Sequence, residues 1–192
     1  MADKDKVYFG FSELHVGTYE YDPDTKTVTL GTPYHQIGAV GFSPEPSDND
    51  NTFYADDIAF FTDNSSPTRS GDLEVAKFDD EFKTTFLGYV TSSNGGIAEV
   101  VNPIKPNVYI AFELKGDAEG RRVIMYNGTL GSINREYSTI EESREPVTES
   151  VPVKFIGDTK SGIIVETLKP GDAGYEDLFT DPAPPTIAGG SQ

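Results

Sequence analysis

The sequence contains no cysteine and no tryptophan in its 192 residues. Without cysteine, thiol catalysis, disulfide bonds and thiolate metal sites are excluded, and folding does not depend on an oxidising compartment. Basic residues are also scarce: 15 Lys and Arg stand against 32 Asp and Glu, which gives a formal net charge of −17. A surface this acidic repels nucleic-acid phosphates, so ordinary DNA binding is not expected.

Segments that would lead the chain into a membrane are also missing. The N-terminal residues MADKDKVYFG lack the apolar core of a signal peptide. No apolar run approaches the ~20 residues that a membrane-spanning helix needs. We therefore expect a protein that is synthesised and folds in the cytoplasm and does not enter a membrane.

Alternating apolar and polar residues predict a mainly β protein with antiparallel strands. The segments with strand character are 72–78, 108–114, 121–128, 150–157 and 162–168. Near the start, Phe9 and Phe11 share one phase of the alternation, whereas Leu14 and Val16 follow the other. This change of phase predicts a bulge or bend near Ser12–Glu13.

Turn residues predict how these strands connect. Residues 22–26, DPDTK, should form a hairpin turn into the strand 27–30. Residues 116–122 should join two antiparallel strands, with Gly116 and Gly120 supplying unusual backbone angles. Residues 157–162 should join the last two strands.

One segment, 78–88, has the pattern of a short amphipathic helix. Asp79 can cap its N-terminus, Phe82 and Phe86 fall on one face, and Gly88 can end it. We expect this helix to lie against a sheet.

Three stretches do not fit the β core. They are the long excursion 44–70, the charged segment 137–150 and the Pro- and Gly-rich tail from Pro170. We therefore expect a single antiparallel β domain over residues 1–169, of the sandwich or barrel type, followed by a C-terminal arm over residues 170–192.

The sequence offers little support for catalysis or for a metal site. His15 and His35 have no HExxH or HxH spacing, so a histidine metal site would have to be assembled from distant residues. The aspartates at 22–24 and 48–50 lack the glycine of a calcium loop. Asp56 and Asp57 would point to opposite faces of a strand, which does not suit a glycosidase. We expect no catalytic residue, no metal and no cofactor.

The segment FYADDIAFF, residues 53–61, is unusually aromatic for an excursion flanked by loop formers. An exposed aromatic patch usually marks an interface. The segment either docks on another copy of the protein or folds back over its own core, and composition alone leaves both possibilities open.

Several motifs in order resemble the major tail proteins of phages of Gram-positive bacteria with long, non-contractile tails. They are Tyr54-Ala55-Asp56-Asp57, Gly71-Asp72-Leu73-Glu74-Val75 and Phe86-Leu87-Gly88, followed by the strand–turn–strand segment 108–130 and the segment 138–157. The likeness spans roughly residues 7–169. Asn127, where lysine is common in the family, and the Pro-rich tail depart from the pattern.

The resemblance implies a structural virion protein that assembles in the host cytoplasm. Six copies would form a ring whose inner sheets join into one β-barrel, and rings would stack into a tail tube that conducts DNA during ejection. Other partners would be the tape-measure, tail terminator and distal tail proteins. Residues 44–70 would contact the adjacent ring, and the N-terminal residues and the tail would be further arms across subunits. The implied inter-ring residues are Phe53, Tyr54, Asp56, Asp57, Ile58, Phe60 and Phe61.

An acidic lumen would let DNA slide without binding the wall. The candidates for lumen-lining carboxylates are Glu13, Glu20, Asp72, Glu74, Glu113 and Glu166. Each of them could instead lie on the solvated outside, which is the usual place for a charge on a strand.

Two other functions compete with the tail tube. One is a different tube component on the same scaffold, such as a tail terminator or an effector-injection tube, which fold-level physics does not separate. The other is a carbohydrate-binding β-sandwich, against which the lack of tryptophan and of placed catalytic groups argues.

Overall fold

The computed structural model describes residues 10–47, 50–55, 58–64, 67–137 and 147–187. It is mainly β, with antiparallel strands and one short α-helix, as the sequence predicts. The strands are β1 (Gly10–Asp22), β2 (Thr27–Leu30), β3 (Tyr34–His35), β4 (Ala39–Phe42), β5 (Glu45–Ser47), β6 (Asp50–Ala55), β7 (Ile58–Asn64), β8 (Thr68–Val75), β9 (Val90–Thr91), β10 (Ile97–Ala98), β11 (Asn107–Lys115), β12 (Arg122–Leu130), β13 (Glu149–Phe155) and β14 (Val165–Leu168). The helices are α1 (Asp80–Phe86) and the 3₁₀ helix η1 (Glu176–Phe179).

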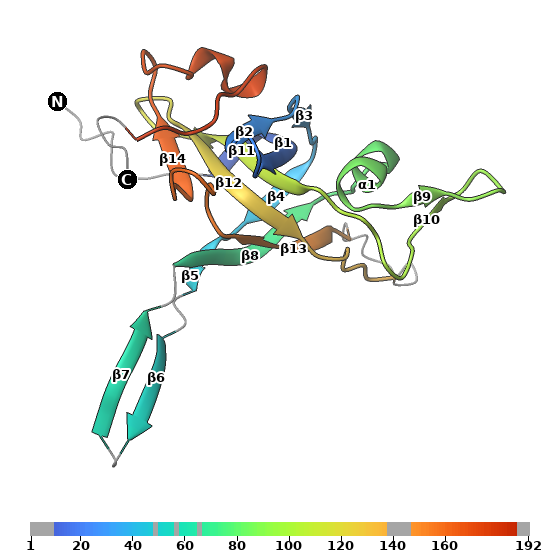
Figure 1. Ribbon diagram of the computed structural model, residues 1–192. Coiled ribbons are helices and arrows are strands. Elements are labelled where there is room, and N and C mark those ends of the chain that lie inside the picture. The colour runs from blue at the N-terminus through green and yellow to red at the C-terminus, as the bar shows by residue number, and fades with distance from the viewer. Residues whose placement is uncertain (1–9, 48–49, 56–57, 65–66, 138–146, 188–192) are drawn as a thin grey trace.

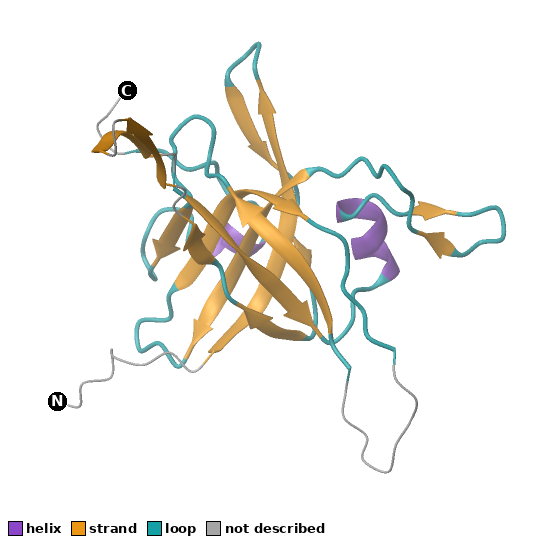
Figure 2. Ribbon diagram, turned by 90° about the horizontal axis from the view of Figure 1, so that it is seen from below, coloured by secondary structure: helices purple, strands orange, loops and turns teal. Residues whose placement is uncertain are grey.

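One ten-stranded sheet forms the body of the molecule. Its order is β2-β1-β11-β12-β13-β8-β4, with β3 on β1, β14 on β12 and β5 on β8. The sheet curls, and the short link from β3 to β4 ties β1 to β8: the Gln36 amide donates to Leu14, and the Ala76 amide donates to Gly38. The body is therefore barrel-like, with an inside and an outside (Figures 1 and 2).

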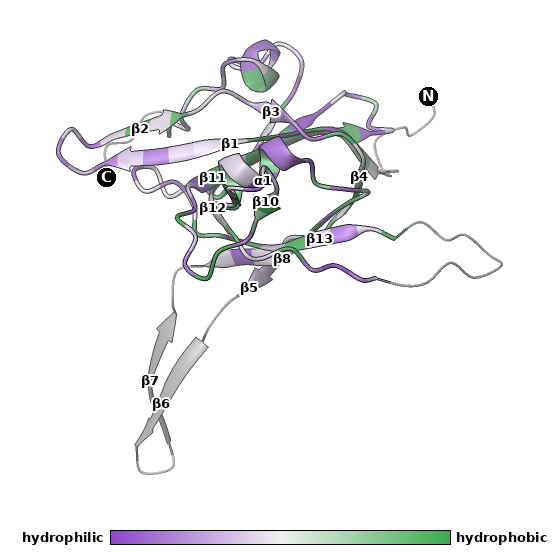
Figure 3. Ribbon diagram, turned by 90° about the vertical axis from the view of Figure 1, so that its right-hand side faces the viewer, coloured by the Kyte–Doolittle hydropathy of each residue, from purple (hydrophilic) through white to green (hydrophobic). Residues whose placement is uncertain are grey.

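The interior core fills the inside of this barrel. Figure 3 shows hydrophobic residues, in green, along the strands of its wall. Leu73 and Val75 of β8 are fully buried, as their alternation predicts. Val108 and Ile110 of β11 join them from the opposite wall. The buried members of the interior core are Leu14, Val16, Leu73, Val75, Phe78, Phe82, Phe86, Leu87, Tyr89, Val108, Ile110, Phe112, Val123, Met125, Leu130, Val151, Val153 and Phe155.

A second, outer core lies on the other face of β11 and β12. There Tyr109 and Tyr126 pack with Tyr175 and Leu178 from the C-terminal segment. Residues 175–179 therefore pack on their own sheet, and the expectation that the C-terminal segment reaches other subunits stays a prediction. The sequence could not indicate this packing, because η1 supplies only a few apolar residues between Pro- and Gly-rich flanks.

The phase change in the first strand is a bulge, as predicted. The β1–β11 register shifts between Ser12 and His15, and Glu13 has a φ of 54°. The sheet contains a second bulge, which the sequence analysis did not predict: the β11–β12 register shifts between Val108 and Ile110, and Asn127 of β12 has a φ of 56°. Asn and Asp tolerate this left-handed conformation better than most residues do.

The predicted turns also form. Asp22 pairs with Thr27 at the end of the β1–β2 hairpin, and its carboxylate accepts the amides of Asp24 and Thr25. Gly116 and Gly120 have φ of 79° and 64° between β11 and β12. Residues 157–162 connect β13 to β14, and both strands pair with β12.

The helix forms as its caps predict. Asp79 accepts the Phe82 amide at 2.7 Å, and Gly88, with a φ of 67°, follows the C-cap. Phe82 and Phe86 are buried in the interior core. Within the part of the chain that is described, no helix combines the length and apolarity needed to cross a bilayer.

The aromatic excursion forms a hairpin of its own. β6 and β7 make a separate two-stranded antiparallel sheet, with Phe53 opposite Phe61 and Tyr54 opposite Ala59. In Figure 1 this hairpin extends away from the barrel, beyond β5 and the start of β8.

Candidate functional site

The projecting β6–β7 hairpin carries the residues implied for the inter-ring contact. The backbones of Phe53 and Tyr54 lie in β6, and those of Ile58, Phe60 and Phe61 lie in β7. Asp56 and Asp57 lie outside the described residues. Of the two possibilities that composition left open, the position of the strands away from the barrel favours a contact with another molecule. That contact stays a prediction.

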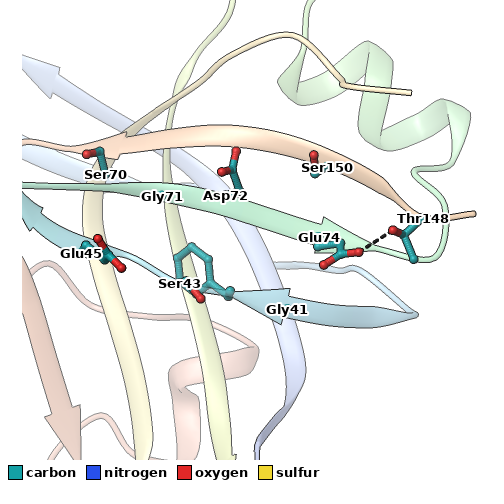
Figure 4. A pocket seen from close by; sticks show the side chains of 10 residues that line it. Gly41, Ser43, Glu45, Ser70, Gly71, Asp72, Glu74, Thr148 and Ser150 are labelled. Carbon is teal, nitrogen blue, oxygen red and sulfur yellow. Dashed lines mark hydrogen bonds between the residues drawn. The ribbon is translucent and has the colours of Figure 1, made fainter. Parts of the chain in front are cut away.

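An acidic groove runs along the outer side of β8 (Figure 4). Its volume is about 500 Å³. Asp72 and Glu74 point into it because Leu73 and Val75 of the same strand point into the interior core. Glu45 of β5 adds a third carboxylate. The groove is lined by Gly41, Phe42, Ser43, Glu45, Ser70, Gly71, Asp72, Glu74, Thr148 and Ser150.

The chemistry of this groove is that of a polar acidic wall. Thr148 donates a hydrogen bond to Glu74, while Asp72 is exposed. The lining contains hydroxyl groups but neither a histidine to activate them nor a basic side chain to hold an anion. The groove therefore suits the repulsion of anions better than catalysis.

The remaining predicted lumen carboxylates are scattered over other surfaces. Glu113 lies 3.6 Å from the Arg122 guanidinium, and Glu166 accepts a 2.8 Å hydrogen bond from the Tyr126 hydroxyl. Burial, reinforced by that hydrogen bond, raises the pKa of Tyr126 above its usual range. Glu20 is exposed on β1. Glu13 lies beside His35, on the part of the sheet that β3 borders.

A cluster of Glu13, His15 and His35 was missed by sequence reasoning. One ligand atom of each residue lies within 4.8 Å of the others. The signal was hidden because the histidines are far apart in the sequence and only the β1–β3 register brings them opposite each other. The phase change at Ser12–Glu13 was a clue to the third member, since the bulge sets the direction of Glu13.

The environment of His15 favours its neutral form. Burial is the largest influence and lowers the pKa of His15 below its usual 6.5. The hydrogen bond to the Glu13 carbonyl and the negative charge of Glu13 raise this pKa, whereas the charges of His35 and Arg122 lower it. The imidazole is held between two parallel rings, with centroids 4.6 Å from that of His35 and 4.5 Å from that of Phe179.

Comparisons with known proteins show a weak structural likeness. No protein-family model matches the sequence, and no curated protein is similar to it. A solved structure described as the anti-feeding prophage cap, a tube-terminating cap, is similar over 88% of this chain and 97% of its own. The TM-score is 0.40 and the identity 12%. At that level of likeness, function has to be argued from the surfaces of the molecule itself.

Proposed function

We propose that this protein is a structural subunit of a phage tail tube, in which six copies form a ring and the rings stack into a conduit for DNA. The observation that carries the proposal is the aromatic β6–β7 hairpin, which extends from a barrel-like body. The ordered motifs that resemble major tail proteins support the same function.

The hairpin needs a partner for physical reasons. A two-stranded hairpin alone is marginally stable in water. Each aromatic side chain can bury about 150–250 Å², so Phe53, Tyr54, Phe60 and Phe61 could together bury about 600–1,000 Å² where neighbouring subunits cover both faces of the hairpin. One partner of a stable protein–protein interface contributes about 800 Å². The hairpin is therefore large enough to hold one ring on the next.

The barrel offers strand edges for contacts within a ring. β2 and β4 lie at the two ends of the sheet order. Edge strands present unpaired backbone groups, which a neighbouring subunit can pair. A head-to-tail contact between two different edges generates a closed ring when the rotation between copies fits.

The charge of the protein suits a conduit for DNA. The net charge is −17, and the groove along β8 collects Glu45, Asp72 and Glu74. A wall of this sign attracts no phosphate, so DNA would pass without being held.

The test is negative-stain electron microscopy of the purified protein over a range of concentrations, with light scattering in parallel. We expect hollow tubes, or six-fold rings with a central hole. Single rings that never stack at any concentration would favour the tail-terminator alternative. A compact monomer that also binds members of a polysaccharide panel would replace the proposal with a carbohydrate-binding module.

A further inference from the structure

The Glu13, His15 and His35 cluster has the composition of a metal site. It brings two imidazoles and one carboxylate together, with ligand atoms within 4.8 Å of one another. β1 contributes Glu13 and His15, and β3 contributes His35 directly opposite His15. Two nitrogen ligands and one oxygen ligand are a set that zinc accepts in proteins.

His15 is already oriented to act as a ligand. Its Nδ1 lies 2.8 Å from the Glu13 carbonyl oxygen. A carbonyl only accepts hydrogen bonds, so Nδ1 carries the proton and Nε2 keeps its lone pair. Histidines that bind metals are commonly fixed by such a bond to a backbone carbonyl. The side chain is also immobilised, because it is only 7% exposed and lies between His35 and Phe179.

Glu13 reaches the histidines because the strand departs from regular geometry. Its φ of 54° lies in the left-handed region, which costs free energy for any residue other than glycine. The bulge at this point places the Glu13 Oε2 3.7 Å from the His35 Nε2. Stacking brings the two imidazoles together, and the Glu13 carboxylate, at ion-pair distance from His35, completes a set of three possible metal ligands.

We propose that Glu13, His15 and His35 bind a divalent transition-metal ion, with zinc preferred among the common ions. Ligand atoms about 2.0–2.1 Å from zinc lie roughly 3.4 Å from one another in a tetrahedron. The cluster can contract to that size, because the side chains of His35 and Glu13 are 48% and 51% exposed and can turn. His35 would leave its stack on His15, which stays held by Phe179 and by the Glu13 carbonyl. Magnesium and calcium are disfavoured because they select oxygen ligands.

The ion would join elements that are only weakly connected. β3 is two residues long and pairs with β1 at His15 and Val16. A metal that binds both strands would hold β3 on the barrel, and with it the link that closes the sheet. Binding to the folded state alone raises the folding equilibrium constant about a hundredfold when free zinc is at 100 times its dissociation constant.

The proposal is tested by zinc titration of tag-free, chelator-treated protein in a calorimeter, with urea unfolding followed by circular dichroism. We expect one zinc ion per chain and greater resistance to urea with zinc but not with magnesium. Cobalt in the same site should give the intense visible absorption of a four-coordinate ion. Zinc binding at any number of surface sites without stabilisation would overturn the proposal.

Matched variants separate the cluster from general binding to an acidic surface. His35→Ala and Glu13→Gln should each weaken zinc binding at least tenfold, and both should fold because the substituted side chains are half exposed. Asp72→Asn and Glu74→Gln remove carboxylates from the groove and should leave zinc binding unchanged. Zinc stabilisation that persists in His35→Ala and Glu13→Gln would also overturn the proposal. These measurements do not depend on ring or tube formation.

Discussion

At the scale of single residues, two non-glycine positions in the described strands have left-handed backbones, and each has a different use. Glu13 turns its carboxylate toward His35, whereas Asn127 makes structural hydrogen bonds. The Asn127 Nδ2 donates to the Gly157 carbonyl, and its Oδ1 accepts from Asn107, both at 2.9 Å. Asn127 thereby connects β12, β11 and the segment that follows β13.

We predict that Asn127→Ala lowers the free energy of unfolding by about 2–5 kcal/mol. Alanine in the left-handed region costs about 1–2 kcal/mol. Loss of the hydrogen bond to the buried Gly157 carbonyl costs about 1–3 kcal/mol. The measurement is urea unfolding at neutral pH. Asn127→Gly is the control: it removes the hydrogen bonds but accepts the φ of 56°, so it should cost less. Equal losses in both variants would mean that backbone conformation contributes nothing here.

At the scale of elements, the sequence predicts best where local rules and the fold agree. The cap of α1, the turn at 22–26 and the bulge near Ser12–Glu13 all depend on residues close together in the chain. The outer core under Tyr175 and the pairing of His15 with His35 depend on which segments meet in space. Alternation identifies a strand, but it does not say which distant segment covers its second face.

The first turn of α1 should make stability depend on pH in the acid range. Burial raises the pKa of Asp79, but the hydrogen bonds from the Phe82 amide and the Tyr34 hydroxyl outweigh it, so the pKa lies below the usual 3.8. A carboxyl whose folded pKa is depressed stabilises the protein above its unfolded pKa, and that contribution is lost as pH falls through the lower folded pKa.

We predict that Asp79→Ala lowers the free energy of unfolding by about 1 kcal/mol at pH 7, as expected for loss of an N-cap. The difference between the two proteins should shrink below about pH 4, where Asp79 begins to take up a proton. Thermal unfolding of both proteins at pH 7 and pH 3 measures this difference in stability. Asp80→Ala is the matched control, because Asp80 lies in the same turn but makes no capping bond to an amide among the contacts described for it. A difference that stays constant with pH would exclude the charged carboxylate as the cause.

The hairpin is the element on which assembly should depend. Phe60→Ser with Phe61→Ser should leave the circular dichroism spectrum and the unfolding midpoint nearly unchanged while abolishing stacking of rings in electron micrographs. The reason is that β6 and β7 pair only with each other in the described sheets. Phe60→Leu with Phe61→Leu keeps most of the apolar area and should still assemble. Unfolding of the serine variant would instead place these residues in the core of their own subunit.

At the scale of the whole molecule, charge would oppose the proposed assembly and the hairpin would favour it. Each subunit carries −17, so bringing copies together costs electrostatic free energy. Salt shortens the screening length from about 30 Å at 0.01 M to about 8 Å at 0.15 M. An interface that depends on aromatic burial should survive this screening, so a tube built in this way forms more readily as salt rises over that range.

The acidic groove gives the last prediction, which concerns where β8 faces in the tube. If Asp72 lines the lumen, Asp72→Lys changes the wall by on the order of ten charges per ring of six, and cationic walls hold DNA. We expect tubes of this variant to retain short duplex DNA that is protected from nuclease, with retention falling as salt rises. Asp24→Lys, in the exposed β1–β2 turn, is the matched control with the same change of charge. DNA on that variant should be digested if the turn lies outside the lumen. DNA bound to the outside of a tube is open to the nuclease, so digestion of the DNA on both variants would place β8 on the outer surface. The groove would then not be part of the conduit.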